Sequence, residues 1–138
     1  MKQAVLNFLH FCDAANIDSV GKLSILGIFS KIYLTGVPGK FPRFSIVFNL
    51  GFKNLEQIKN KVTVKIFNPD KKEIYLLQPI TIEFMIKEED MKKEGDMNLI
   101  LEIANIEFKA FGIHTVAIYL NSNEIGNKFF LVEERKIN

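Results

Sequence analysis

The chain has 138 residues, a length that suits one compact domain over residues 1–138. Hydrophobic residues make up 48% of the chain and charged residues 25%, a balance that excludes general disorder. The formal net charge is only +2, far below the surplus of a protein that binds nucleic acid through its phosphates, and the single cysteine, Cys12, excludes an intrachain disulfide.

The first third of the chain predicts two strands and a connection. Val5 to Cys12 has apolar residues on both faces, which predicts a central strand that is covered on both sides. The polar residues 13–21 predict a loop that ends in a glycine with positive φ. Lys22 to Leu34 predicts one long strand with a β-bulge near Gly27, where the phase of the apolar residues slips by one. Two prolines and two glycines in residues 35–42 predict a connection between sheets, without ladder pairing.

The rest of the chain predicts short strands joined by turns. Arg43 to Phe52 alternates most regularly, with its phenylalanines on one side. Residues 53–60 predict a loop or a single helical turn, and residues 87–96 a short helical excursion or a solvated loop. Further strands are predicted at 61–66, at 73–77 as a hairpin partner, at 80–86 after Pro79, at 98–108, and at 113–120 and 125–133 around a four-residue loop.

These elements predict an all-β fold. Seven to nine strands with hairpin-scale connections, and at most short helical turns, are typical of an antiparallel β-sandwich, Ig-like or related. The 13 phenylalanines predict an interior rich in aromatic rings.

Four residues have the character of metal ligands: His10, Cys12, Asp13 and His114. His10 and Cys12 stand two apart on a predicted strand and share a face, and His114 joins them only if the last hairpin packs nearby. Structural roles compete with this hypothesis, because a buried free cysteine acts as a small hydrophobe and a buried histidine bonds to the backbone. We therefore expect no metal site, no cofactor and no catalytic residue, and keep a small metal-dependent or ligand-binding enzyme built on these four residues as the alternative.

Other chemistries find less support. Gly21-Lys22 suggests a phosphate-binding loop, but that motif requires glycine where Asn16 stands, a hydroxyl residue where Leu23 stands, and a following helix. No sequence signature of a nucleophile elbow is present. Four glutamates at alternating positions predict a solvated sheet face, and three tyrosines are the candidates for exposed aromatic contacts: Glu83, Glu102, Glu107 and Glu133, and Tyr33, Tyr75 and Tyr119.

Several short motifs resemble an uncharacterised family of small bacterial proteins. They are Leu-x-x-Cys-Asp at residues 9–13, Gly-Lys-Leu-x-x-x-Gly-x-Phe at residues 21–29, the proline-bearing link to Pro42, and the closing segments 111–116 and 130–132. The resemblance spans most of the chain and implies a bacterial β-sandwich of unknown function. It implies no catalytic or binding residue.

We expect a non-catalytic protein-interaction or assembly module, with a protein partner or a second copy of itself, because the apolar residues on both strand faces exceed what one core requires. A structural component of a larger assembly is a third possibility, for which a long unpaired edge strand is expected. No apolar run approaches the roughly 18 residues of a membrane span. An unpaired cysteine suits a reducing compartment, so we expect a cytoplasmic protein without a membrane or nucleic-acid partner.

Overall fold

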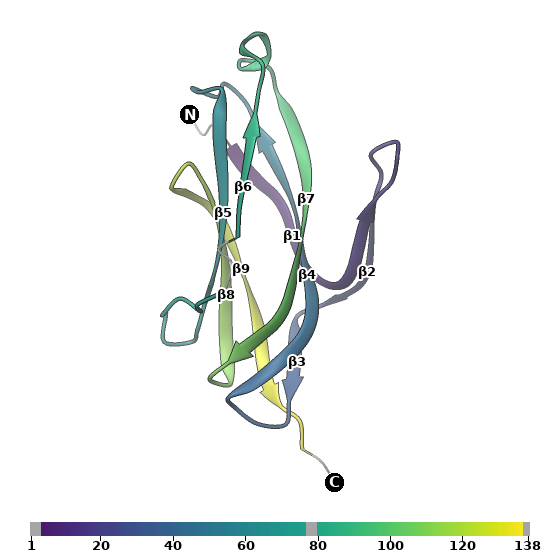
Figure 1. The fold of residues 1–138 in the computed structure, drawn as a ribbon, viewed down its shortest axis with the longest axis vertical. Coiled ribbons are helices and arrows are strands. Elements are labelled where there is room, and N and C mark those ends of the chain that lie inside the picture. Colours follow the sequence, from purple (N-terminus) through teal and green to yellow (C-terminus); the bar gives the residue numbers. More distant parts are fainter. Residues whose placement is uncertain (1–3, 77–79, 137–138) are drawn as a thin grey trace.

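A computed structural model describes residues 4–76 and 80–136 as two β-sheets packed face to face (Figure 1). Sheet A has the order β2-β1-β4-β7 and sheet B the order β3-β9-β8-β5-β6. The strands are β1 (Ala4–Ile17), β2 (Leu23–Phe29), β3 (Lys31–Leu34), β4 (Gly39–Phe52), β5 (Lys59–Phe67), β6 (Ile80–Met85), β7 (Gly95–Phe108), β8 (Gly112–Leu120) and β9 (Asn123–Glu134). The predicted all-β, antiparallel β-sandwich is confirmed, and nine strands lie in the described residues.

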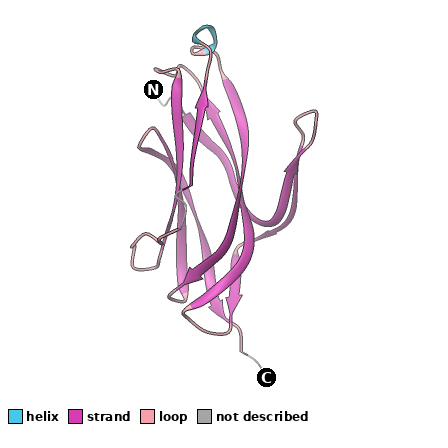
Figure 2. Ribbon diagram, in the orientation of Figure 1, coloured by secondary structure: helices cyan, strands magenta, loops and turns pink. Residues whose placement is uncertain are grey.

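Strands dominate the described chain, as Figure 2 shows. One short 3₁₀ turn, Glu88–Asp90, stands where the sequence left a helical excursion or a loop open. The paired strands are antiparallel except β3 and β9, which run parallel. None of the described residues forms a helix with the length and apolar character needed to cross a membrane.

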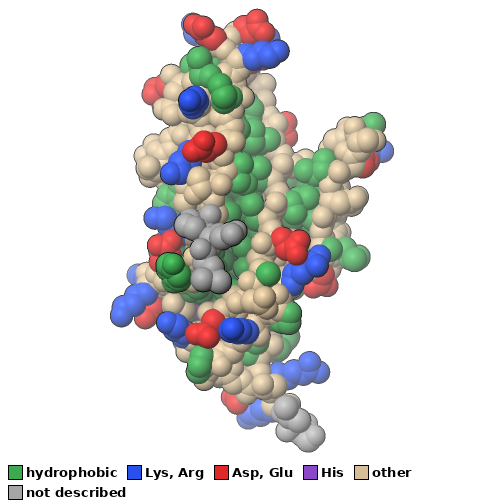
Figure 3. Space-filling view, in the orientation of Figure 1, with side chains coloured by type: hydrophobic (Ala, Val, Ile, Leu, Met, Phe, Trp, Pro, Cys, Tyr) green, Lys and Arg blue, Asp and Glu red, His purple; other side chains and the backbone are tan. Residues whose placement is uncertain are grey.

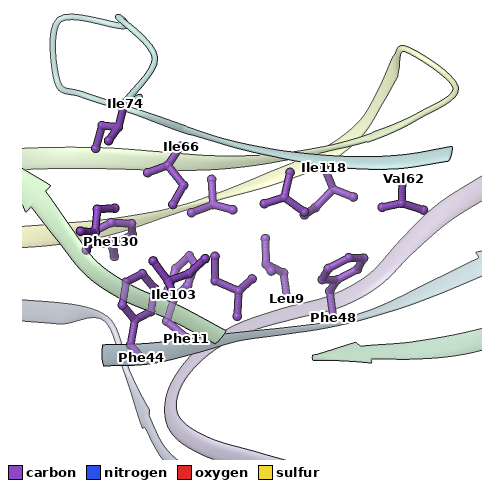
Figure 4. Packing of buried hydrophobic residues seen from close by; sticks show 14 of the residues in the cluster. Leu9, Phe11, Phe44, Phe48, Val62, Ile66, Ile74, Ile103, Ile118 and Phe130 are labelled. Carbon is purple, nitrogen blue, oxygen red and sulfur yellow. The ribbon is translucent and has the colours of Figure 1, made fainter. Parts of the chain in front are cut away.

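The core is a stack of phenylalanine rings between the sheets. Phe11, Phe44 and Phe48 of sheet A point toward sheet B, where Ile118 and Phe130 meet them (Figure 4). The rings of Phe11 and Phe130 are 5.1 Å apart at 69°, an edge-to-face arrangement that aromatic quadrupoles favour. The predicted phenylalanine face of residues 43–52 is therefore confirmed as core.

β4 is buried on both of its faces. Its inner face carries the phenylalanines, while Ser45, Val47 and Asn49 on the outer face are also buried, at 5% exposed or less. β1 and β7 flank β4 on either side along nearly its whole length. Their side chains cover the outer face of β4, so this strand rather than β1 is the most enclosed of sheet A.

The predicted loop at residues 13–21 is partly wrong. β1 continues to Ile17 and pairs with β2, which begins at Leu23, so only residues 18–22 form the turn. The polar residues here are strand residues on a hairpin that extends beyond the packed sheets (Figure 1). Their ladder is held by backbone hydrogen bonds and needs no buried side-chain face.

The predicted long strand from Lys22 to Leu34 is two strands. β2 belongs to sheet A and β3 to sheet B, and the chain passes between the sheets at Ser30. The register of β1 and β2 runs without a shift past Gly27, so the predicted bulge is absent, although this glycine does have φ 69°. No residue is inserted: Leu23 and Ile25 lie on one face of β2, and Leu26 and Ile28 lie on the other, so β2 is apolar on both faces.

Three further predictions need correction. The connection between β3 and β4 is shorter than residues 35–42, because β4 begins at Gly39 and pairs with β7 from there. Residues 73–76 hold a single bridge, Phe67 to Glu73, in place of a hairpin strand. The last hairpin turns through Asn121 and Ser122, both with positive φ, a two-residue turn in place of a four-residue loop. The predictions for Leu77 and Pro79 lie outside the described residues.

Candidate interaction surface

A projecting hairpin, here called the arm, comprises residues 13–28. Its turn is fixed by Asp18, whose Oδ1 accepts the backbone N–H groups of Val20 and Lys22 at 2.9 and 2.8 Å. Gly21 takes φ 85°, the positive angle that the sequence predicted for this turn. The arm is thus a hairpin with its own built turn, and in Figure 3 it stands away from the body of the molecule.

The arm exposes several apolar side chains to solvent. Val20 at its tip is 77% exposed, and Leu26 and Ile28 on β2 are 70% and 58% exposed. Phe29 faces the core through its contact with the ring of Phe44, so Leu26 and Ile28, which have the opposite parity, lie on the outer face of sheet A. Exposed apolar groups clustered on one projection are typical of an interaction site.

β2 is also an edge strand without a charged residue. Edge strands commonly carry charges that discourage pairing with another chain. The other three edge strands in the described part of the molecule follow this rule: β3 contains Lys31, β6 contains Glu83, and β7 contains Asp96, Glu102 and Glu107. β2, with the sequence Leu-Ser-Ile-Leu-Gly-Ile-Phe, contains none.

The other notable feature of sheet A is a polar cluster on its outer face. Asn49 Nδ2 donates to Asp96 and Asn98 at 2.8 and 2.9 Å, and Asn49 Oδ1 accepts from Asn7 at 2.8 Å. These bonds join β1, β4 and β7 beside a hollow of about 480 Å³. Because the buried Asn49 amide is fully used within the protein, we assign it a structural role.

The structure does not bring together the four candidate ligand residues of the alternative hypothesis. His10 and Cys12 share the outer face of sheet A, opposite Val47 and Ser45, as their spacing predicted. Asp13 lies on the other face of the ladder, and His114 is fully buried in the core. Across residues 4–76 and 80–136, no group of three or more His, Cys, Asp or Glu side chains is placed to hold a metal ion.

Cys12 and His114 occupy apolar surroundings. Burial, and then the charge of Asp13, raise the pKa of the Cys12 thiol above its ordinary value. Burial lowers the pKa of His114, whose ring stacks on Phe130 at 5.5 Å and meets the edge of Phe108 at 5.0 Å. Its Nδ1 lies 3.0 Å from the Gly112 carbonyl oxygen, while its buried Nε2 makes no hydrogen bond. A thiol held protonated is a poor nucleophile and a poor ligand.

His10 differs because it lies next to a lysine. Partial burial, and then the ammonium of Lys128 near its Nδ1 at 3.5 Å, lower the pKa of His10. Its ring stacks on Phe8 at 5.5 Å. His10 is therefore positioned by its neighbours on the outer face of sheet A, away from His114.

The remaining candidates are dispersed over the surface. Lys22 closes the turn of the arm through its backbone and is not part of a phosphate loop. Glu83, Glu102 and Glu107 are exposed on strands, as predicted for a solvated face, and Glu133 is partly exposed beside Lys31. Two tyrosines lie on separate strands of sheet B and one in the β5–β6 connection: Tyr33, Tyr119 and Tyr75.

Sequence reasoning missed the arm because it interpreted residues 13–21 as a loop. The sequence did contain a signal for it. Leu23 and Ile25 fall on one face of a strand and Leu26 and Ile28 on the other, in a segment that contains no charge. Such a segment is either buried on both faces or exposed to a partner.

Comparisons with known proteins extend this description. The model of a family described as "Family of unknown function (DUF6941)" matches residues 7–133. No curated protein matches the chain. Among solved structures, an alkylpurine DNA glycosylase from Pseudomonas fluorescens, bound to DNA, is similar at 12% identity with a TM-score of 0.52. The match covers 95% of this chain and 30% of the glycosylase chain, and at this identity it shows the fold alone.

A second solved structure is an immunoglobulin-like protein from Pseudomonas aeruginosa. It is 10% identical with a TM-score of 0.41, and the match covers 95% of this chain and 97% of that one. That likeness is too low to carry an argument.

Proposed function

The chain belongs to the family DUF6941, whose function is unknown, and we propose that it is a non-catalytic protein-interaction module that binds through its arm. The observation that carries this proposal is the free edge of β2: it is exposed and apolar on a projecting hairpin, and it lacks the charges found on the other described edges.

The mode of binding that fits this edge is strand addition. An edge strand offers unpaired backbone N–H and C=O groups, and a second strand that pairs with them extends the sheet. The exposed side chains of Leu26 and Ile28 then pack beside those of the incoming strand. Main-chain hydrogen bonds supply affinity in this mode, and the apolar neighbours supply selectivity for a segment that also alternates apolar residues.

β7 supports assembly less well, although it is the long edge strand expected for a component of a larger particle. It runs for 14 residues at the edge of sheet A. Its three acidic residues and the positive φ of 54° at Asn105 interrupt the flat, uncharged edge that pairing requires. We therefore place the partner on β2.

A protein partner is favoured over nucleic acid and membrane. The net charge of +2 gives little attraction for phosphates, and the arm itself carries only Asp13, Asp18 and Lys22. We place this role in a bacterial cytoplasm, from the resemblance of the motifs and from the single unpaired cysteine.

Affinity capture with three baits tests the proposal in a lysate of the cells that make the protein. The baits are the wild type, Leu26→Lys on the arm, and Met85→Lys on edge strand β6, where Met85 is also 70% exposed. Proteins held by the wild type and by Met85→Lys, but lost with Leu26→Lys, support binding through the arm. Recovery of the same proteins with all three baits would show that the arm is not the binding surface.

A further inference from the structure

The partner of the arm can be named more closely, in an inference that rests on the proposed function. We propose that β2 pairs antiparallel with β2 of a second copy of this chain, so that two sheets of order β2-β1-β4-β7 become one continuous sheet around a two-fold axis. The axis passes near Leu26, in the middle of the strand.

Self-pairing suits β2 because the strand is apolar on both faces. A two-fold axis perpendicular to the sheet places the outer face of one copy beside the outer face of the other, and the inner face beside the inner face. With the axis at Leu26, this residue lies opposite its own copy and Ile28 lies opposite Ser24 of the other copy, all on the outer face. The inner face of the joined strands brings Leu23 opposite Phe29. Each copy thus covers apolar groups of the other that are exposed in the single chain.

Charge distribution along the arm agrees with this arrangement. β2 itself has no charge that would meet its own copy across the axis. Antiparallel pairing directs the tip of one arm toward the base of the other and brings Lys22 near Lys31 of the other copy. Asp18, which is bonded across the turn to Lys22, supplies a carboxylate at this end to offset the two ammonium groups. Lys31 is about half exposed and holds Glu133 only at 3.7 Å, so its ammonium remains open to a second carboxylate. A different partner would have to supply this complementarity independently.

The turn geometry lets this charge be removed without damage to the arm. Asp18 Oδ1 accepts the two backbone N–H groups that fix the turn, and the amide oxygen of asparagine accepts the same bonds. Asp18→Asn therefore keeps the arm folded and removes only the charge. We expect it to weaken self-association several-fold at low ionic strength, and less in high salt.

Sedimentation equilibrium of the purified full chain tests the proposal. We expect a monomer–dimer equilibrium at micromolar concentration that Leu26→Lys weakens at least tenfold and that Met85→Lys leaves unchanged. Leu26 is mostly exposed in the single chain, so its replacement leaves the fold intact, which a circular-dichroism spectrum checks.

Engineered cysteines test the direction of pairing. Leu26→Cys places two thiols at the two-fold axis, where opposite Cβ atoms are about 4.5–5.5 Å apart, near the distance that a disulfide requires. Val20→Cys, at the equally exposed tip, places the two thiols at opposite ends of the paired strands. Mild oxidation should therefore link Leu26→Cys into dimers and leave Val20→Cys as monomers. The native Cys12 is fully buried and does not contribute.

The outcomes separate this proposal from the one on which it rests. A chain that stays monomeric, while arm-dependent capture of another protein persists, would sink self-pairing and keep the interaction module. Dimers that form equally in Leu26→Lys, or cross-linking through Val20→Cys alone, would also overturn self-pairing through β2. A monomer without any arm-dependent partner would overturn both proposals.

Discussion

Lys128 Nζ lies 2.7 Å from the carbonyl oxygen of Leu9 and so ties β9 of sheet B to β1 of sheet A. β1 pairs with β2 only from Phe11 onward, so no described strand pairs with β1 on that side at Leu9. The same ammonium lies 5.9 Å above the ring of Phe11. The side chain of Lys128 thus bridges the two sheets at a point where no described strand pairs with β1 on that side.

Lys128→Met should lower the free energy of unfolding by about 1 kcal/mol, because it removes one hydrogen bond from a charged donor at a half-buried position. Urea unfolding of the variant measures this loss. Lys61→Met, at an exposed position of β5, is the matched control and should change stability by less than about 0.5 kcal/mol. Equal stability of the two variants would show that the bond to Leu9 contributes nothing.

Phe48→Ala should lower the free energy of unfolding by about 3–5 kcal/mol, because Phe48 is fully buried between the sheets and the smaller side chain leaves a cavity. Phe129→Ala removes the same ring from a position that is 62% exposed and should cost far less. Thermal or urea unfolding compares the two. A loss below about 1 kcal/mol for Phe48→Ala would contradict its place in the core.

Stability should fall as the pH drops below about 6.5, the ordinary pKa of histidine. Burial lowers the pKa of His114 in the folded protein, so the unfolded chain binds the proton first and folding is penalised from that pH downward. One such group contributes at most about 1.4 kcal/mol per pH unit.

His114→Phe keeps an aromatic ring between Phe108 and Phe130 and removes the titration. Its unfolding free energy should therefore depend less on pH between about 7 and 5.5 than that of the wild type. His10→Gln serves as the comparison for the second histidine with a lowered pKa. An unchanged pH slope in His114→Phe would assign the acid sensitivity to other groups.

Asn49→Asp should destabilise the protein at neutral pH more than at acidic pH. Asn49 Nδ2 donates to Asp96 at 2.8 Å, and a carboxylate in its place would face the Asp96 carboxylate across the same distance. Protonation of one of the two relieves the repulsion, so the variant should approach the wild type near pH 4, around the ordinary pKa of aspartate.

Asn98→Asp changes the same cluster at a less buried position and is the control. Chemical denaturation at several pH values compares the two variants. A destabilisation of Asn49→Asp that is independent of pH would contradict the repulsion argument.

The sequence predicted those parts of the fold in which side-chain burial follows strand alternation. Residues 43–52 alternate because their phenylalanines enter the core, and the period of two is visible without a structure. The arm has no such signal over residues 13–17, because its ladder holds the backbone while its side chains stay largely in solvent. The sequence pattern also did not predict the position of each strand in its sheet, because this position depends on the strand order.

The arrangement of the candidate ligand residues, and the exposure of the arm, could be predicted only in part, because strand order cannot be read from local alternation. The spacing of His10 and Cys12 gave their common face correctly, since alternation is a local property. Whether His114 reaches them depends on which sheet carries β8, and the structure places this histidine in the interior against Phe130. Exposure of Leu26 and Ile28 depends likewise on the place of β2 at the end of sheet A, on a hairpin that extends beyond the packed sheets (Figure 1).

The place of β9 in sheet B has a consequence for how the protein is made. β9 lies between β3 and β8, so among the described strands β3 pairs only with β9, the strand farthest from it along the sequence on its C-terminal side. During synthesis β3 therefore stays without this partner, and Phe11 without the ring of Phe130, until residues 130–134 have been translated. Sheet B therefore cannot be completed before β9 has been made.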